Sequence, residues 1–169
     1  GRSPRPDAPH LRHKGLPAYG STAIDEEKGI VEAFVAGIGN KDSVADIIEP
    51  GAFVDSIKAR KPKGVWSHNW DRPVSKTLEI KEVAAGDASL PKKMLDAKIG
   101  GLYVKTQFNL DTQDGRDAFS WVKFYDDESE WSIGYQVDDS VYDTKMKAMR
   151  LKKIDLFEYS PVLFGANPL

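Results

Sequence analysis

Three polar side chains that lie far apart in the sequence have the chemical types of a serine-hydrolase site. His68 is the only histidine beyond the N-terminal tail, Ser132 lies in Trp-Ser-Ile-Gly-Tyr, and Glu158 lies in Asp-Leu-Phe-Glu-Tyr-Ser-Pro-Val. A serine becomes a nucleophile when a base takes its proton, histidine is the usual base near neutral pH, and a carboxylate orients that base. If the three converge in space, the protein can catalyse acyl transfer. If they do not, it is an ordinary β-rich domain.

Ser132 lies in a segment that alternates between large apolar and small residues. This period of two predicts a strand in which Ser132 and Gly134 share the face opposite the apolar side chains. Gly134 has no side chain to block a substrate that approaches this face. The ordinary alternative, a strand serine that faces solvent, is favoured by this segment alone. Ser67, Ser120 and Ser160 are rival nucleophiles, but none has such a small neighbour on its own face.

Glu158 is surrounded in sequence by apolar residues on both faces of a predicted strand. Burying a carboxylate is costly unless a partner compensates its charge, and His68 or a nearby cation could be that partner. Alternatively the strand lies at a sheet edge and Glu158 faces water, which Pro161 permits because it cannot donate to a central ladder. Asp71 and Asp155 are the rival carboxylates.

The composition excludes several other functions. The chain has 169 residues, a formal net charge of −2 and no cysteine. A slightly acidic chain disfavours nucleic-acid binding, and the lack of cysteine excludes disulfides and thiolate chemistry. No apolar run is long enough to cross a membrane. His10 and His13 form a weak i, i+3 pair in the tail, which we interpret as solvated, so we expect neither a metal nor another cofactor.

The expected elements are mostly strands. Residues 1–25, rich in proline, glycine and basic side chains, predict a flexible arm, and residues 26–169 a single domain. Periodicity predicts a short helix that places Phe53 and Ile57 on one face, and a helix over residues 114–125. These elements do not alternate as βαβ units, which predicts a mainly β (α+β) fold with an antiparallel sheet or barrel. Strands are expected over residues 30–38, 65–70, 74–83, 101–110, 131–137 and 151–163.

Five segments, in this order, resemble the prohead (capsid maturation) proteases of tailed bacteriophages. They are Ile47–Phe53, the strand end at His68, Gly101–Val104, Ser132–Tyr135 and Asp155–Val162. The similarity runs from about Ile30 to Pro168. Each motif alone is weak, but five motifs in the same order as in the family make a fairly specific match. The resemblance implies a closed, largely antiparallel β-barrel flanked by short helices, as in the herpesvirus capsid proteases to which this family is related in fold.

The resemblance also implies a function. Ser132 would be the nucleophile, His68 the general base and Glu158 the third member of the triad. The protein would be a serine endopeptidase that cleaves the major capsid protein, the scaffold or both inside the assembling prohead, in the host cytoplasm. Self-cleavage and a homo-oligomer are compatible with it, whereas membrane and direct nucleic-acid partners are not expected.

One segment departs from the family pattern. The family usually shows Pro-Ala-Asn after its last strand, whereas this chain has Phe164-Gly165-Ala166-Asn167. A glycine-containing turn can aim backbone amides at an anion, so we expect Phe164, Gly165 and Ala166, together with Gly134, to form the oxyanion and substrate loop.

Two other functional classes make different structural predictions. A non-catalytic capsid-assembly or scaffolding module of the same fold would hold Ser132 and His68 too far apart for a hydrogen bond. A small-molecule esterase or amidase would keep the three residues but place them in a deep, closed pocket. Such an enzyme would differ from the α/β-hydrolases, because this chain lacks their Gly-x-Ser-x-Gly elbow.

Overall fold

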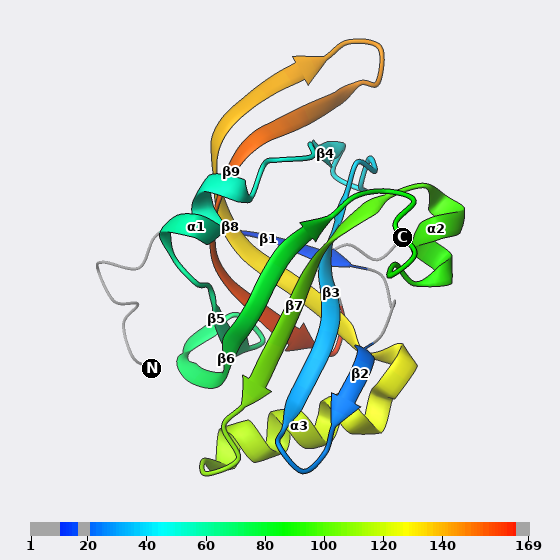
Figure 1. Ribbon diagram of the computed structural model, residues 1–169. Helices are drawn as coiled ribbons and strands as arrows, with labels where there is room; N and C mark the ends of the chain where they lie inside the picture. Colours follow the sequence, from blue (N-terminus) through cyan, green and yellow to red (C-terminus); the bar gives the residue numbers. More distant parts are fainter. Residues whose placement is uncertain (1–10, 17–20, 165–169) are drawn as a thin grey trace.

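The computed structural model describes residues 11–16 and 21–164 (Figure 1). It is built mainly of strands, with three α-helices and one short 3-10 helix, η1, among these residues. The elements are, in chain order, β1 (Arg12–Leu16), β2 (Ser21–Asp25), β3 (Ile30–Ile38), β4 (Asp46–Ile48), α1 (Val54–Ala59), β5 (Lys63–Trp66), β6 (Asn69–Val83), α2 (Lys92–Ala97), β7 (Gly100–Phe108), α3 (Gln113–Tyr125), η1 (Asp126–Glu128), β8 (Glu130–Asp143) and β9 (Ala148–Val162).

The strands form one sheet that is open rather than closed. Its order is β1-β8-β9-β5-β6-β7-β3-β2, and β4 pairs with β9 beside this path. Strands β1 and β2 end the path and share no ladder within the described residues, so the expectation of a closed barrel was wrong. Closure requires strand number, tilt and stagger to agree around the whole sheet, and local periodicity carries no information on these quantities. The mainly β class and the largely antiparallel pairing were predicted correctly.

Strands β3 and β7 lie close to their predicted ranges, whereas β6 begins at Asn69 rather than at residue 74 and β8 runs to Asp143 rather than to residue 137. Strand β3 spans the predicted 30–38, and β7 alternates as expected, with Leu102, Val104, Thr106 and Phe108 buried. Helix α3 begins after Thr112, whose hydroxyl accepts a hydrogen bond from the Gly115 N–H at 3.1 Å, as an N-cap does. These elements were predictable because each buries one apolar face against the core. The spacing of the apolar residues in the sequence then shows whether the segment is a strand or a helix.

Short and polar elements were missed. Residues 12–16 and 21–25, which belong to the expected flexible arm, form β1 and β2. They carry few apolar side chains, so their pairing depends on neighbouring strands rather than on a pattern of their own. Strand β4 and helix α2 span only 3 and 6 residues, too few to show a period. That residues 26–169 form a single domain stays a prediction.

Strands β8 and β9 form a long hairpin that carries two of the three candidate residues. Its outer end extends away from the rest of the sheet, whereas its inner half lies against the core (Figure 1). The register sets Ser132 opposite Ser160 and Gly134 opposite Glu158. Ser132, Gly134 and Glu158 therefore lie on two paired strands at the buried end of the hairpin. None of the helices described here is long and apolar enough to cross a bilayer.

Candidate active site

Ser132, His68 and Glu158 lie in one hydrogen-bonded chain. Ser132 Oγ is 2.8 Å from His68 Nε2, and His68 Nδ1 makes a short hydrogen bond to Glu158 Oε1. An ionised carboxylate only accepts hydrogen bonds, so Nδ1 carries the ring proton and Nε2 accepts from the serine hydroxyl. This tautomer leaves Nε2 able to take the serine proton. The side chains of Ser132 and Glu158 are fully buried, and that of His68 is 15% exposed.

His68 is positioned by a two-residue hairpin turn, not by the continuous strand expected over residues 65–70. Trp66, the end of β5, pairs with Asn69, the start of β6. The two residues between them, Ser67 and His68, have φ values of 47° and 60°. Positive φ at both central residues is the type I′ arrangement, which normally favours asparagine and glycine. Neither residue here is glycine, so backbone strain is concentrated in the turn that carries the histidine, as is common at functional sites.

Ser160 connects the carboxylate to this turn. Its hydroxyl donates to Glu158 Oε2 at 2.8 Å and accepts from the backbone N–H of His68 at 3.0 Å. The same side chain thus orients the carboxylate and fixes the backbone that carries the imidazole. From its sequence alone, Ser160 is expected only as a rival nucleophile. Its position two residues after Glu158, on the same strand face, is the sequence signal that could have shown this bridging role.

Gly134 makes room for the carboxylate. A Cβ atom built on Gly134 would overlap Glu158 Oε1 and crowd the rest of that carboxylate. The sequence predicts that the missing side chain of Gly134 lets a substrate approach. In the structure the space above it is filled by Glu158, its cross-strand neighbour.

Apart from Ser160, the rival residues do not join this hydrogen-bonded chain. Ser67 and Ser120 are exposed. Asp155 pairs with Arg60, whose Nη2 lies 2.7 Å from its Oδ1. Asp71 is an exposed residue just after the turn, at the start of β6. Glu158 is thus the carboxylate that the fold brings to the imidazole.

The N-terminal strand adds a residue that the sequence had not suggested for this site. The His13 ring stacks on the His68 ring, with centroids 3.7 Å apart and planes at 12°. Its Nε2 lies 4.0 Å from Glu158 Oε1. A potential metal-binding atom from each of His13, His68 and Glu158 lies within 4.8 Å of the others, the one such group found among the described residues. Because Nδ1 and Oε1 already bond to each other, a metal here would disrupt the hydrogen-bonded chain. That the protein uses no metal stays a prediction.

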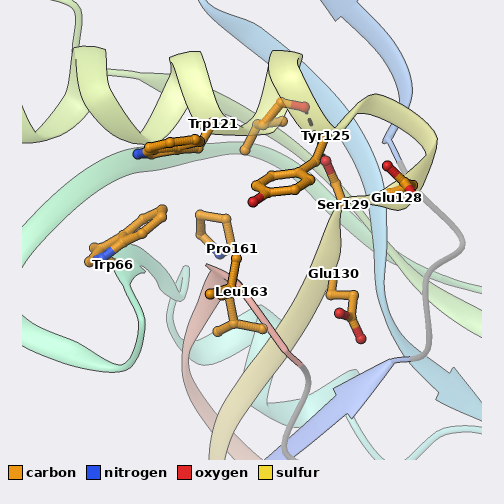
Figure 2. Close-up of a pocket in the computed structure, with 10 residues that line it drawn as sticks. Trp66, Trp121, Tyr125, Glu128, Ser129, Glu130, Pro161 and Leu163 are labelled. Atoms are coloured by element: carbon orange, nitrogen blue, oxygen red, sulfur yellow. Dashed lines mark hydrogen bonds between the residues drawn. The ribbon is translucent and has the colours of Figure 1, made fainter. Parts of the chain in front are cut away.

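An apolar pocket of about 310 Å³ adjoins the site (Figure 2). Trp66 and Pro161 lie on one side of it, and Trp121 and Tyr125 of α3 lie on the other (Figure 2). Trp66 precedes His68 by two residues, and Pro161 follows Ser160. None of the three candidate catalytic residues lines the pocket, so it does not provide the deep catalytic pocket expected of a small-molecule esterase.

The expected oxyanion loop is only partly described. Phe164 is 79% exposed, just beyond the end of β9. Gly165 and Ala166 lie outside the described residues. The oxyanion donors therefore stay a prediction.

The chain is similar to known proteins in both sequence and fold. The sequence profile of the family described as Caudovirus prohead serine protease matches residues 18–169. The fold resembles the solved structure of the bacteriophage T4 capsid assembly protease, with a TM-score of 0.61 over 91% of this chain and 98% of that chain. The two sequences are only 8% identical, so this likeness concerns the fold alone. No curated protein sequence matches significantly.

Proposed function

The chain belongs to the Caudovirus prohead serine protease family, and from that premise we propose that it cleaves peptide bonds with a Ser132–His68–Glu158 triad. Membership in the family makes the protein a serine protease of phage capsid maturation. The observation that carries the triad is the hydrogen-bonded chain from Ser132 Oγ through the imidazole to Glu158. It also argues against the non-catalytic assembly module, which requires these side chains to be apart.

The mechanism follows from this geometry. His68 Nε2 takes the Ser132 proton as Oγ attacks the substrate carbonyl, and the imidazolium then gives that proton to the leaving amine. Water repeats the sequence to release the acyl group. The buried Glu158 carboxylate stabilises the imidazolium and keeps Nδ1 protonated in the resting state. Its partner Ser160 holds the carboxylate in place.

Backbone N–H groups must stabilise the oxyanion, each worth about 3 kcal/mol. Gly134 and the loop of Phe164, Gly165 and Ala166 are the segments we propose for this role. The sequence has a glycine, Gly165, soon after β9, and β9 pairs with the strand that carries Ser132, which supports the choice.

We propose the major capsid protein, the scaffold or both as substrates, with cleavage inside the assembling prohead in the host cytoplasm. Self-cleavage and assembly into a homo-oligomer belong to the same proposal. The family match supports a protein substrate that is presented during assembly.

Replacement of the nucleophile tests this function. Co-expression with the phage's capsid and scaffold proteins should yield cleavage products with the wild-type chain and with Ser120→Ala, which changes an exposed helical serine. Ser132→Ala should lower kcat by a factor on the order of 10⁶, because removing a triad serine removes the covalent route. Gel analysis of the products measures the loss, and circular dichroism checks the fold. Undiminished cleavage by Ser132→Ala would refute the assignment.

A further inference from the structure

The strand face that carries Ser132 continues into the apolar pocket beside α3. Ser132 pairs with Ser160, and the next pair on the same face, two residues further along the ladder, is Glu130 with Val162. The register is regular from Glu130 to Gly134, so these side chains follow one another on one face of the hairpin. Glu130 and Val162 both line the pocket. The pocket therefore begins one step along the ladder from the nucleophile and on the nucleophile's own face.

This spacing matches the repeat of an extended peptide. Two residues of a strand span about 7 Å. A substrate in an extended conformation rises by nearly the same amount per residue. When its scissile carbonyl lies at Ser132 Oγ, a side chain two or three residues from that bond can therefore reach the pocket.

The walls of the pocket are suited to an apolar side chain. Trp121 and Tyr125, one turn apart on α3, face Trp66 and Pro161 across it (Figure 2). Trp121 is 49% exposed, so a substrate side chain can contact this wall from solvent. The volume of about 310 Å³ lies at the small end of the range of roughly 300–1,000 Å³ that is typical of ligand sites. An apolar side chain placed between the aromatic rings would gain free energy by leaving water.

Two carboxylates add a second selective feature. Glu128 and Glu130 line the end of the pocket that lies away from Trp66 (Figure 2). An aspartate or glutamate of a substrate would lose hydration against the aromatic walls and would be repelled by these like charges. The pocket therefore favours apolar side chains and disfavours acidic ones.

We propose that this pocket is a specificity subsite of the protease, which binds a large apolar side chain two or three residues from the bond that is cleaved. The inference rests on the proposed proteolytic function and deepens it by naming the substrate class. Val162 sets the size of the subsite, because it lies on the catalytic face at the edge of the pocket.

A cleavage profile tests the proposal. The probe is a mixture of tryptic peptides from a bacterial lysate, and mass spectrometry identifies the bonds that the full wild-type chain cleaves. At one position, two or three residues from the cleaved bond, leucine, methionine and aromatic residues should be cleaved about tenfold or more faster than alanine. Aspartate and glutamate should be depleted at that position. Cleavage sites mapped in the co-expressed capsid and scaffold proteins should carry the same apolar residue.

Two substitutions at Val162 should change this preference in opposite directions. Val162→Trp fills the pocket and should shift the preferred residue at that one position to alanine or glycine. Val162→Ala enlarges the pocket and should favour tryptophan over leucine there by about tenfold. Val141→Trp and Val141→Ala make the same changes on the outer half of β8, at a side chain that is 45% exposed, and should leave the profile unchanged.

The profile separates this inference from the proteolytic function on which it rests. A position-specific shift does not depend on the overall rate, and a fluorophosphonate adduct on Ser132 shows that a variant keeps its fold and its triad. A wild-type chain that cleaves neither peptides nor capsid protein would refute the proteolytic function, and the subsite with it. Cleavage without an apolar preference within three residues of the bond, or with the same preference in wild type, Val162→Trp and Val162→Ala, would overturn the subsite alone.

Discussion

Glu158 occupies a position where a carboxylate is tolerated only because both of its oxygens have donors. Its side chain is 1% exposed, Oε1 accepts from His68 Nδ1, and Oε2 accepts from the Ser160 hydroxyl. A buried carboxylate without hydrogen-bond partners destabilises the folded state, whereas one that holds an imidazole in a single tautomer supports catalysis. The sequence alone indicated that Glu158 needed a partner and that His68 was a candidate. It did not indicate Ser160, because a serine in a strand can face solvent or a partner with equal ease.

Ser160→Ala should weaken catalysis without removing any reacting group. Loss of the hydroxyl leaves Glu158 Oε2 and the His68 N–H without their described partner, at a cost of about 1–3 kcal/mol. We expect kcat to fall by roughly tenfold or more with little change in KM, because the alignment of the base is lost rather than substrate contacts. Steady-state kinetics on a peptide substrate measures both constants. An unchanged kcat would show that Ser160 does not position the triad.

Gly134→Ala should act through Glu158. The new methyl group overlaps the carboxylate, so Glu158 must leave its place beside the imidazole. We expect kcat to fall by about 10² or more, as when a triad carboxylate stops orienting its histidine. The matched test is Glu158→Ala, alone and combined with Gly134→Ala. The double variant should be no less active than Glu158→Ala, because both changes remove the same interaction. Fully additive losses would mean that Gly134 acts on something else.

The elements that position the site differ in how far the sequence could predict them. Strand β8 was predicted because large residues alternate along it, and β9 because its apolar run is long. The β5–β6 hairpin was missed because its turn is Ser67-His68 rather than the Asn-Gly that usually marks such a turn. A polar pair in a strained turn is the kind of local inconsistency expected at a functional site.

Ser67→Gly should stabilise this hairpin. Ser67 is exposed and has a φ of 47°, a conformation that costs a residue with a side chain about 1 kcal/mol and glycine almost nothing. We expect the free energy of unfolding to rise by up to about 1 kcal/mol, or Tm by roughly 2–4 °C. Thermal denaturation measures the change. Ser120→Gly, in the middle of α3, is the control and should destabilise by about 0.5–1 kcal/mol. A loss of stability in Ser67→Gly would contradict the strained turn.

At the scale of the whole molecule, the site depends on contacts between segments that are distant in the sequence. The register of β8 against β9 brings Ser132, Ser160, Gly134 and Glu158 together, and the β5–β6 turn delivers His68 from about 90 residues upstream of Glu158. The candidate residue types and the strand faces on which they lie were therefore predictable from the sequence. That these residues converge in one site was inferred only from a family resemblance. The open sheet could not be predicted, because no local pattern reveals whether β1 and β2 meet. An 8% identical chain with a similar fold shows that this architecture tolerates extensive sequence change.

The central claim, that Ser132 is the nucleophile activated by His68, is tested most directly by covalent labelling during capsid cleavage. A fluorophosphonate reacts with an activated serine, and mass spectrometry of the digested protein locates the adduct. Under conditions in which the wild-type chain cleaves capsid protein, we predict that the reagent stops cleavage, that the adduct lies on Ser132, and that His68→Ala is not labelled. An adduct on Ser67, Ser120 or Ser160, or cleavage that stops while Ser132 stays unmodified, would contradict the claim.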